Sequence, residues 1–427
     1  MRMITYPDSR TPREVNTALL ALLLVILSPV LIAVGFIVYM WTRFRGAPAA
    51  PREGRSLERR TGVKTMSEVM ELLEKIKFSS SFPGPLSSAV SIFIDLIPSA
   101  LAATRITAGL VYPYPPSFEP IMLESQDGTP VCGHLALQAG DARRPALILA
   151  SGACASKNAG WVLSLALHAY YDWGFHVLAM DLRNRGDSGR FSEAPTSWGY
   201  RESDDVLAAA DYLDSLEIVS TVGVCAAGMA GSAALIAAGR SRLDRPLAGG
   251  VVAIGAYAEA ASEVARLSGR SPSAPTASVR RALQRVLLFF KTLSDGPRGF
   301  FDPGRYTREV SCQYYEMAES DLYSKASPVK MMSEIEVPCL LVHARDDLMS
   351  PVGDAHDLLA AAGENPMVCA MIVPSGGHEL YGPATRGWLS ETLETFFTYW
   401  GEFSVVHEEG LGLAGIDSMD IFGNPDN

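Results

Sequence analysis

The peptide from Thr221 to Leu235 has the pattern of a strand, a sharp turn and a helix, which is the order of a nucleophile elbow. In the elbow pattern G-x-S-x-G, the central serine occupies a strained turn that lifts its hydroxyl above the sheet. The residues aligned with that pattern are Ala226, Ala227, Gly228, Met229 and Ala230. Gly228 therefore stands at the nucleophile position and brings no side chain for covalent chemistry.

A second alignment of this peptide places a thiol at the nucleophile position. The run from Gly223 to Ala227 puts Cys225 at its centre, although this choice shortens the strand and delays the helix. The first alignment fits both flanks, because residues 222–225 form an apolar run typical of a buried parallel strand and residues 233–238 are small and helix-compatible. Ser232 lies one helical turn beyond Gly228, where packing or capping is expected.

Length and charge bound the class of protein. The 427 residues are 48% hydrophobic and can bury one large core plus appendages, while the net charge of −11 disfavours nucleic acid as a partner.

The six cysteines are scattered, which predicts buried free thiols in a reducing compartment. The histidines lack H-E-x-x-H spacing, and neither G-x-G-x-x-G nor G-x-x-x-x-G-K-[ST] occurs. We therefore expect no metal and no cofactor.

The segment from Ala18 to Trp41 contains 24 residues without a charge. A bilayer-crossing helix needs about 20 such residues, whereas the apolar core of a cleaved signal peptide normally has about 7 to 15. Six arginines lie between residues 43 and 60, against three before the segment. Because positive charge stays in the cytoplasm, the sequence predicts a single-pass membrane anchor with a cytoplasmic C-terminal domain.

Around this span the sequence divides into five parts. Residues 1–17 precede it, and residues 42–118 form a juxtamembrane linker with an amphipathic stretch near residues 89–104. Residues 119–403 alternate strand and helix patterns, which predicts an α/β sheet covered on both faces. Residues 404–427 are acidic and aperiodic, as in a flexible tail.

Eight strands are predicted in the α/β part, at residues 121–126, 131–138, 145–151, 175–181, 219–226, 248–255, 338–344 and 367–373. Asp127 to Pro130 is a hairpin turn signal, so the sheet should open antiparallel and continue parallel. Helices are predicted at residues 160–173, 200–216, 229–240, 352–362 and 386–402. An insertion at about 258–336, with an amphipathic stretch from Val279 to Leu293, is expected to form a helical lid.

Residues 119–403 resemble the α/β-hydrolase family, in which the nucleophile, the acid and the histidine follow in that order. The peptide from Val337 to Pro351 resembles the seventh strand and acid loop, with Asp347 as the acid and Asp346 as the fallback. The peptide from Val373 to His378 resembles the loop that carries the general base, His378. A carboxylate on one imidazole nitrogen would fix the tautomer that leaves the other nitrogen free to accept a proton.

The resemblance also implies an oxyanion hole, formed by the amide of Met229 and an amide near Ala153. The turn from Ser151 to Ala153 resembles the family's His-Gly turn, with serine in place of histidine. The peptide from Asp181 to Ser188 resembles the segment D-x-R-G-x-G-x-S beside the site, except at Asn184. Residues 301–302 and 321–327 are loosely similar to membrane-linked esterases and lipases.

Two functions follow from these features. The first is esterase- or lipase-like hydrolysis of an apolar acyl ester, thioester or amide, in which His378 activates water because Gly228 cannot attack. The second is a catalytically inactive family member that uses the pocket for ligand binding or scaffolding. The expected partners are the lipid bilayer and an apolar small-molecule or acyl ligand.

Overall fold

The computed structural model describes residues 2–6, 64–79, 114–153, 155–241, 246–268, 302–347, 349–380 and 385–401. The strands are β1 (Met3–Thr5), β2 (Glu119–Glu124), β3 (Pro130–Ala136), β4 (Arg144–Ala150), β5 (His176–Met180), β6 (Val219–Ala227), β7 (Val251–Ile254), β8 (Cys339–Ala344) and β9 (Val368–Val373). The predicted eight strands each overlap one of β2 to β9. The predicted count is wrong by one, because β1 lies in a segment assigned to the region before the span.

The nine strands form one sheet in the order β1-β9-β8-β7-β6-β4-β5-β3-β2. Only the pairs β2 with β3 and β3 with β5 are antiparallel. The remaining pairs are parallel, so the carboxyl ends of β4, β6, β7, β8 and β9 share one edge of the sheet. Residues that follow these strands are therefore brought together, however far apart they are in the sequence.

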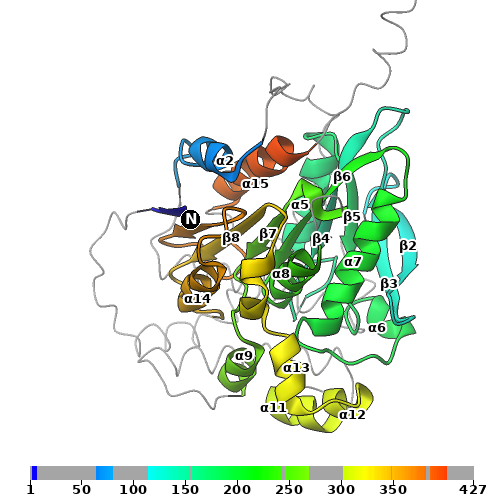
Figure 1. Ribbon diagram of the computed structural model, residues 1–427. Helices are drawn as coiled ribbons and strands as arrows, with labels where there is room; N and C mark the ends of the chain where they lie inside the picture. Colours follow the sequence, from blue (N-terminus) through cyan, green and yellow to red (C-terminus); the bar gives the residue numbers. More distant parts are fainter. Residues whose placement is uncertain are drawn as a thin grey trace, which may run out of the picture.

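Helices cover both faces of the sheet (Figure 1). The main ones are α2 (Met66–Leu73), α5 (Gly160–Tyr171), α7 (Tyr200–Asp214), α8 (Met229–Arg240), α14 (Gly353–Ala362) and α15 (Arg386–Trp400). The helices α2, α5 and α15 pack in one core cluster, and α7, α8 and α14 pack in the other. Both faces of the sheet are therefore shielded from solvent, as the continuous apolar runs of the strands require.

Shorter elements follow β7 and belong to the predicted insertion. They are α9 (Ala260–Leu267), α11 (Pro303–Tyr306), the π-helical turn η5 (Thr307–Ser311), α12 (Cys312–Tyr314) and α13 (Glu319–Lys325). The described residues also form four one-turn pieces, which are α6 (Ser188–Phe191), η3 (Pro246–Gly249), η6 (Pro328–Lys330) and η7 (Met332–Glu334). In Figure 1 the elements α9, α11, α12 and α13 gather at the end of the molecule opposite α2 and α15.

The strand β1, which precedes the predicted membrane span in the sequence, forms one edge of the sheet by pairing with β9. Residues Met3, Ile4 and Thr5 pair with Ala370, Met371 and Ile372 of β9. The α2 helix, on the other side of the span, packs beside α15 and buries Val69, Met70 and Leu73 completely. The two flanks of the segment 7–63 therefore meet at one edge of the domain, next to each other (Figure 1).

In the part of the chain that the structure describes, no helix combines the length and the apolar composition that a membrane crossing requires. The predicted span from Ala18 to Trp41 lies outside the described residues, as do the amphipathic stretch 279–293 and the tail 404–427.

A buried ion pair holds the segment after β5 in place. The Arg183 guanidinium is fully buried, with Nη2 2.6 Å from Oδ1 of Asp205 and Nη1 2.7 Å from Oδ2 of Asp127. It thus joins the β2–β3 turn to α7. Asp205 is fully buried, whereas the Asp127 side chain is 28% exposed.

We predict that Asp205→Ala lowers the free energy of unfolding by about 3–5 kcal/mol, because removing one partner of a buried pair leaves a charge uncompensated. Asp127→Ala is the matched control and should cost clearly less, since water reaches that carboxylate. Urea denaturation of both variants measures the difference. Equal losses, or a loss below 1 kcal/mol for Asp205→Ala, would show that Arg183 does not anchor this segment.

Candidate functional site

Gly228 forms the turn between β6 and α8, as the first alignment requires. Its backbone angles, φ 57° and ψ −126°, lie in a region that favours glycine, and its amide donates to the Ile254 carbonyl at 2.8 Å. Met229 is the first residue of α8. The turn thus has the sharp geometry of a nucleophile elbow with no side chain at its crest.

Ser232 has the structural role expected from the sequence. It is buried, and its hydroxyl donates a hydrogen bond to the carbonyl of Tyr257 at 3.1 Å.

Asp347 follows β8 and His378 follows β9, so the parallel register brings them to the elbow. The imidazole Nδ1 of His378 lies 2.8 Å from Oδ2 of Asp347. The other carboxylate oxygen, Oδ1, accepts from the amides of Met349 at 2.7 Å and Ser350 at 3.1 Å. Asp347 is thereby fixed from two sides and orients the ring of His378.

Asp346, the fallback acid, takes a different direction. Its Oδ1 accepts from the amide of Gly377 at 3.0 Å, in the loop before His378. Asp346 therefore shapes the loop that carries the histidine, while Asp347 is the carboxylate that contacts the ring.

The electrostatics of the pair favour its charged form. Burial lowers the pKa of His378, but the charge and hydrogen bond of Asp347 outweigh it and raise that pKa to about 9. Burial likewise raises the pKa of Asp347, but His378 brings it below its ordinary value. At neutral pH the ground state is an imidazolium beside a carboxylate, and the base form of His378 gains population as the pH rises.

The Nε2 atom of His378 points at the crest of the elbow. A Cβ built on Gly228 would lie 2.8 Å from Nε2, closer than real Cβ contacts allow. The imidazole therefore lies over the glycine, and a serine at this position would require the ring or the backbone to shift.

The turn after β4 packs against the elbow on its other side. A Cβ on Gly152 would lie 3.0 Å from the Ala227 carbonyl oxygen and 3.5 Å from the Met229 nitrogen. Ala153 and Met229 both line the pocket that contains Gly228 and His378. The two residues named for the oxyanion hole thus lie together beside the vacant nucleophile position.

Lys157 fixes this turn and was not singled out from the sequence. Its side chain is 1% exposed, with Nζ 2.6 Å from Oδ2 of Asp181 and 2.5 Å from Oδ2 of Asp187. Its amide donates to Oδ1 of Asp181 at 2.7 Å. Burial lowers the pKa of Lys157, but Asp181 raises it above its ordinary value. The segment 181–188 therefore holds the turn by a buried ion pair.

Cys225, the alternative nucleophile, lies inside β6. It is completely buried, in the core cluster that α2, α5 and α15 cover, and it is not among the residues that line the pocket. Burial raises the pKa of its thiol. A thiol with these surroundings is protonated and inaccessible, so the geometry does not support the second alignment.

The pocket over the elbow is mostly apolar. Its wall includes Trp198, Tyr257 and Met349, and α9 of the insertion adds Leu267 and Glu263. The first helix of the predicted lid therefore borders the site.

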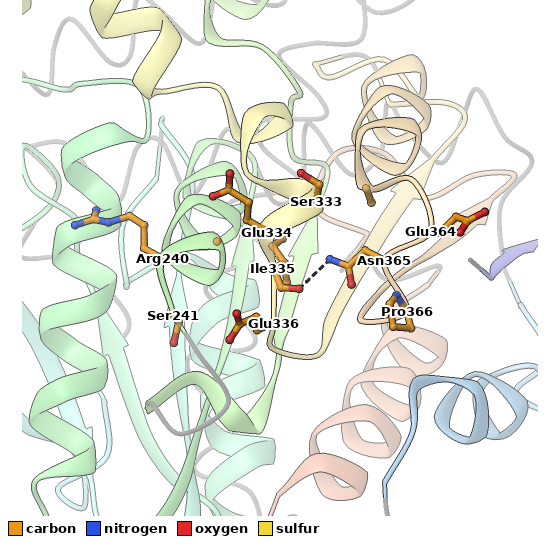
Figure 2. Close-up of a pocket in the computed structure, with 11 residues that line it drawn as sticks. Arg240, Ser241, Ser333, Glu334, Ile335, Glu336, Glu364, Asn365 and Pro366 are labelled. Atoms are coloured by element: carbon orange, nitrogen blue, oxygen red, sulfur yellow. Dashed lines mark hydrogen bonds between the residues drawn. The ribbon is translucent and has the colours of Figure 1, made fainter.

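A second, wider hollow lies at the other end of β8 and β9, where the Asn365 side-chain amide donates to the Ile335 carbonyl at 2.8 Å (Figure 2). Its lining residues include neither histidine nor cysteine.

Among the residues that the structure describes, no group of three or more histidine, cysteine, aspartate or glutamate side chains is arranged to hold a metal ion.

A parallel sheet, a strand-turn-helix elbow and an acid and histidine on the last two strand loops define the α/β-hydrolase class. The model of the alpha/beta hydrolase family matches residues 147–386, which is more than half of the chain, and the chain belongs to this family.

Solved structures to which the chain is similar include an esterase of Pyrococcus furiosus and an acylaminoacyl peptidase of Pyrococcus horikoshii. The esterase is 16% identical with a TM-score of 0.46, covering 66% of this chain and 92% of its own. The peptidase is 13% identical with a TM-score of 0.44, covering 66% of this chain and 41% of its own. No curated protein matches the chain.

We predict that the Asp347–His378 pair makes stability depend on pH. Because the pKa of His378 is raised and that of Asp347 is lowered in the folded state, the stabilisation is complete from about pH 4, the ordinary pKa of an aspartate, to about pH 6.5, and it is lost as the pH rises through about 9. Asp347→Asn should lower the free energy of unfolding by about 3 kcal/mol at pH 6 and by progressively less toward pH 9.5.

The exposed pair His168 and Asp172, with Nδ1 and Oδ2 2.6 Å apart, supplies the control. Asp172→Asn should cost at most about 1 kcal/mol, since solvent screens that pair. A cost for Asp347→Asn that does not change between pH 6 and 9.5 would contradict the charged pair.

Proposed function

We propose that this protein hydrolyses an ester, thioester or amide of an apolar acyl group and that water, rather than a side chain, attacks the acyl carbon. The single observation that supports this most is the Asp347–His378 hydrogen bond of 2.8 Å, directed at an elbow that lacks a nucleophile. An intact acid and base with no side-chain nucleophile at the crest suits water activation.

In the proposed reaction the acyl carbonyl lies over Gly228, with its oxygen toward the amides of Met229 and Ala153. His378 in its neutral form takes a proton from water through Nε2, and the water oxygen bonds to the carbonyl carbon. The amides stabilise the resulting oxyanion. The imidazolium, held by Asp347, then returns the proton to the leaving oxygen, sulfur or nitrogen as its bond to carbon breaks, giving an acid and an alcohol, thiol or amine.

The second candidate is a ligand-binding member without catalysis. It is favoured by the closeness of His378 Nε2 to Gly228, since a Cβ there would come within 2.8 Å of it, and by the protonated state of His378 near neutral pH. An imidazolium beside two amides would bind a carboxylate or carbonyl oxygen without turning it over. Turnover that depends on His378 separates the two candidates.

We predict slow hydrolysis of short-chain thioesters by the unmodified protein, with a rate that rises toward pH 9 as His378 loses its proton. His378→Ala should abolish this rate, and a fluorophosphonate probe should leave the unmodified protein unlabelled. Gly228→Ser should gain labelling, which the double variant Gly228→Ser/His378→Ala should lack.

Two results would count against water activation. Labelling of the unmodified protein that disappears in Cys225→Ala would show that the thiol attacks. A folded Gly228→Ser variant that stays unlabelled, together with no His378-dependent turnover, would leave the ligand-binding function.

We further propose that the apolar run Ala18–Trp41 attaches the protein to a membrane and that the domain lies on the cytoplasmic side. The contacts on its two flanks favour a topology other than the single pass expected from the sequence. Arg2 Nη2 lies 2.7 Å from Glu74 Oε2, and the Tyr6 hydroxyl donates to the Ile76 carbonyl at 3.0 Å. A single crossing would separate these partners, so we propose that the N-terminus also lies on the cytoplasmic side.

We predict that epitope tags at the N-terminus and at the C-terminus are both protected from protease added outside intact cells. Cell disruption should expose both tags, and detergent, rather than high salt, should release the protein from membranes. External cleavage of the N-terminal tag alone would establish the single-pass topology instead. Recovery of the full-length protein without detergent would contradict membrane attachment.

A further inference from the structure

Glu379 follows His378 directly and contributes to the same pocket. Its side chain is buried, with 4% of the residue exposed, and it lines the pocket together with Gly228 and His378. Its Oε2 atom has no hydrogen-bond donor within reach among the described residues. Trp161 donates a side-chain hydrogen bond to this carboxylate, but in the part of the chain that the structure describes the Oε2 atom remains an acceptor without a donor.

The other acidic groups of the site are compensated. Asp347 has His378 and two amides, and Glu263, also in the pocket wall, lies 2.7 Å from the Arg266 guanidinium. For Glu379 no ion pair occurs in the described part of the chain. Burial raises its pKa to about 7 despite the nearby His378, so the protein leaves its charge without full compensation.

The wall around this carboxylate is apolar. Trp198, Tyr257, Leu267 and Met349 border the pocket and carry no charge, and the charge of His378, which Asp347 already holds, lowers the pKa of Glu379 by less than burial raises it. A ligand that fills it therefore has an apolar body, and the group that reaches Glu379 meets an unpaired acceptor in a dry setting. An ammonium group satisfies both the hydrogen bond and the charge, and a charge-assisted bond of this kind is about twice as strong as a neutral one.

We propose that Glu379 determines specificity by receiving a primary or secondary ammonium group, so that the pocket takes amine-bearing acyl compounds. This inference rests on the proposed function for the nature of the acyl group. The recognition itself depends only on the pocket and on Glu379, and it can be measured without turnover.

The test compares hexylamine with hexanol, two probes of similar size, by calorimetric titration of the full-length protein at pH 8. Hexylamine should bind about tenfold more tightly or better, which corresponds to one charge-assisted hydrogen bond. Glu379→Gln should remove this preference. Glu364→Gln, an exposed carboxylate in the distant hollow, is the matched control and should keep it.

If Glu379→Gln does not fold, the variant Glu379→Met, whose side chain has a similar volume, provides a second test and should also lose the preference for hexylamine. Equal affinity of the unmodified protein for both probes, or a preference that survives in Glu379→Gln and Glu379→Met, would overturn the proposal. Because both probes lack an acyl group, these results stand whether or not His378-dependent hydrolysis is found. Loss of hydrolysis with an intact preference for hexylamine would refute only the proposed function.

Discussion

The hydrogen bond between Asp347 and His378 is the interaction on which the site depends. It forms because β8 and β9 are adjacent parallel strands, so that the loops after them meet at one edge of the sheet. The amides of Met349 and Ser350 fix the carboxylate, which in turn fixes the ring. The direction of Nε2 toward the elbow, the charge state of the ring and the proposed route of the proton all follow from this pair.

Glycine at the crest changes what this pair can do. A serine would share its proton with Nε2, but the glycine lets the ring approach the backbone and leaves the amides proposed for the oxyanion hole without an attached nucleophile. It also removes the strain that a Cβ would suffer at φ 57°. The buried Lys157–Asp181 pair still holds the opposing turn, so the part of the site proposed to bind an acyl oxygen is supported independently of the elbow.

The sequence predicted β2 to β9 well because strands buried on both faces are continuous apolar runs, as residues 222–225 of β6 illustrate. It could also pair Asp347 with His378, since each follows an adjacent strand in the order of the family. It could not predict β1, because three residues carry no period and their partner strand lies more than 360 residues away. Lys157 and Glu379 were missed in the sequence because charged residues in loops are usually exposed to solvent. Their burial depends on the tertiary fold and leaves no local sequence pattern.

The most direct test of the central claim is intact-mass spectrometry of the protein, quenched with acid during turnover of a short-chain thioester. Attack by water predicts free acid in solution, no acyl adduct on the protein, and loss of acid formation in His378→Ala. An adduct of one acyl group on the unmodified protein would contradict the account, because it would require a side-chain nucleophile that the geometry around Gly228 does not supply.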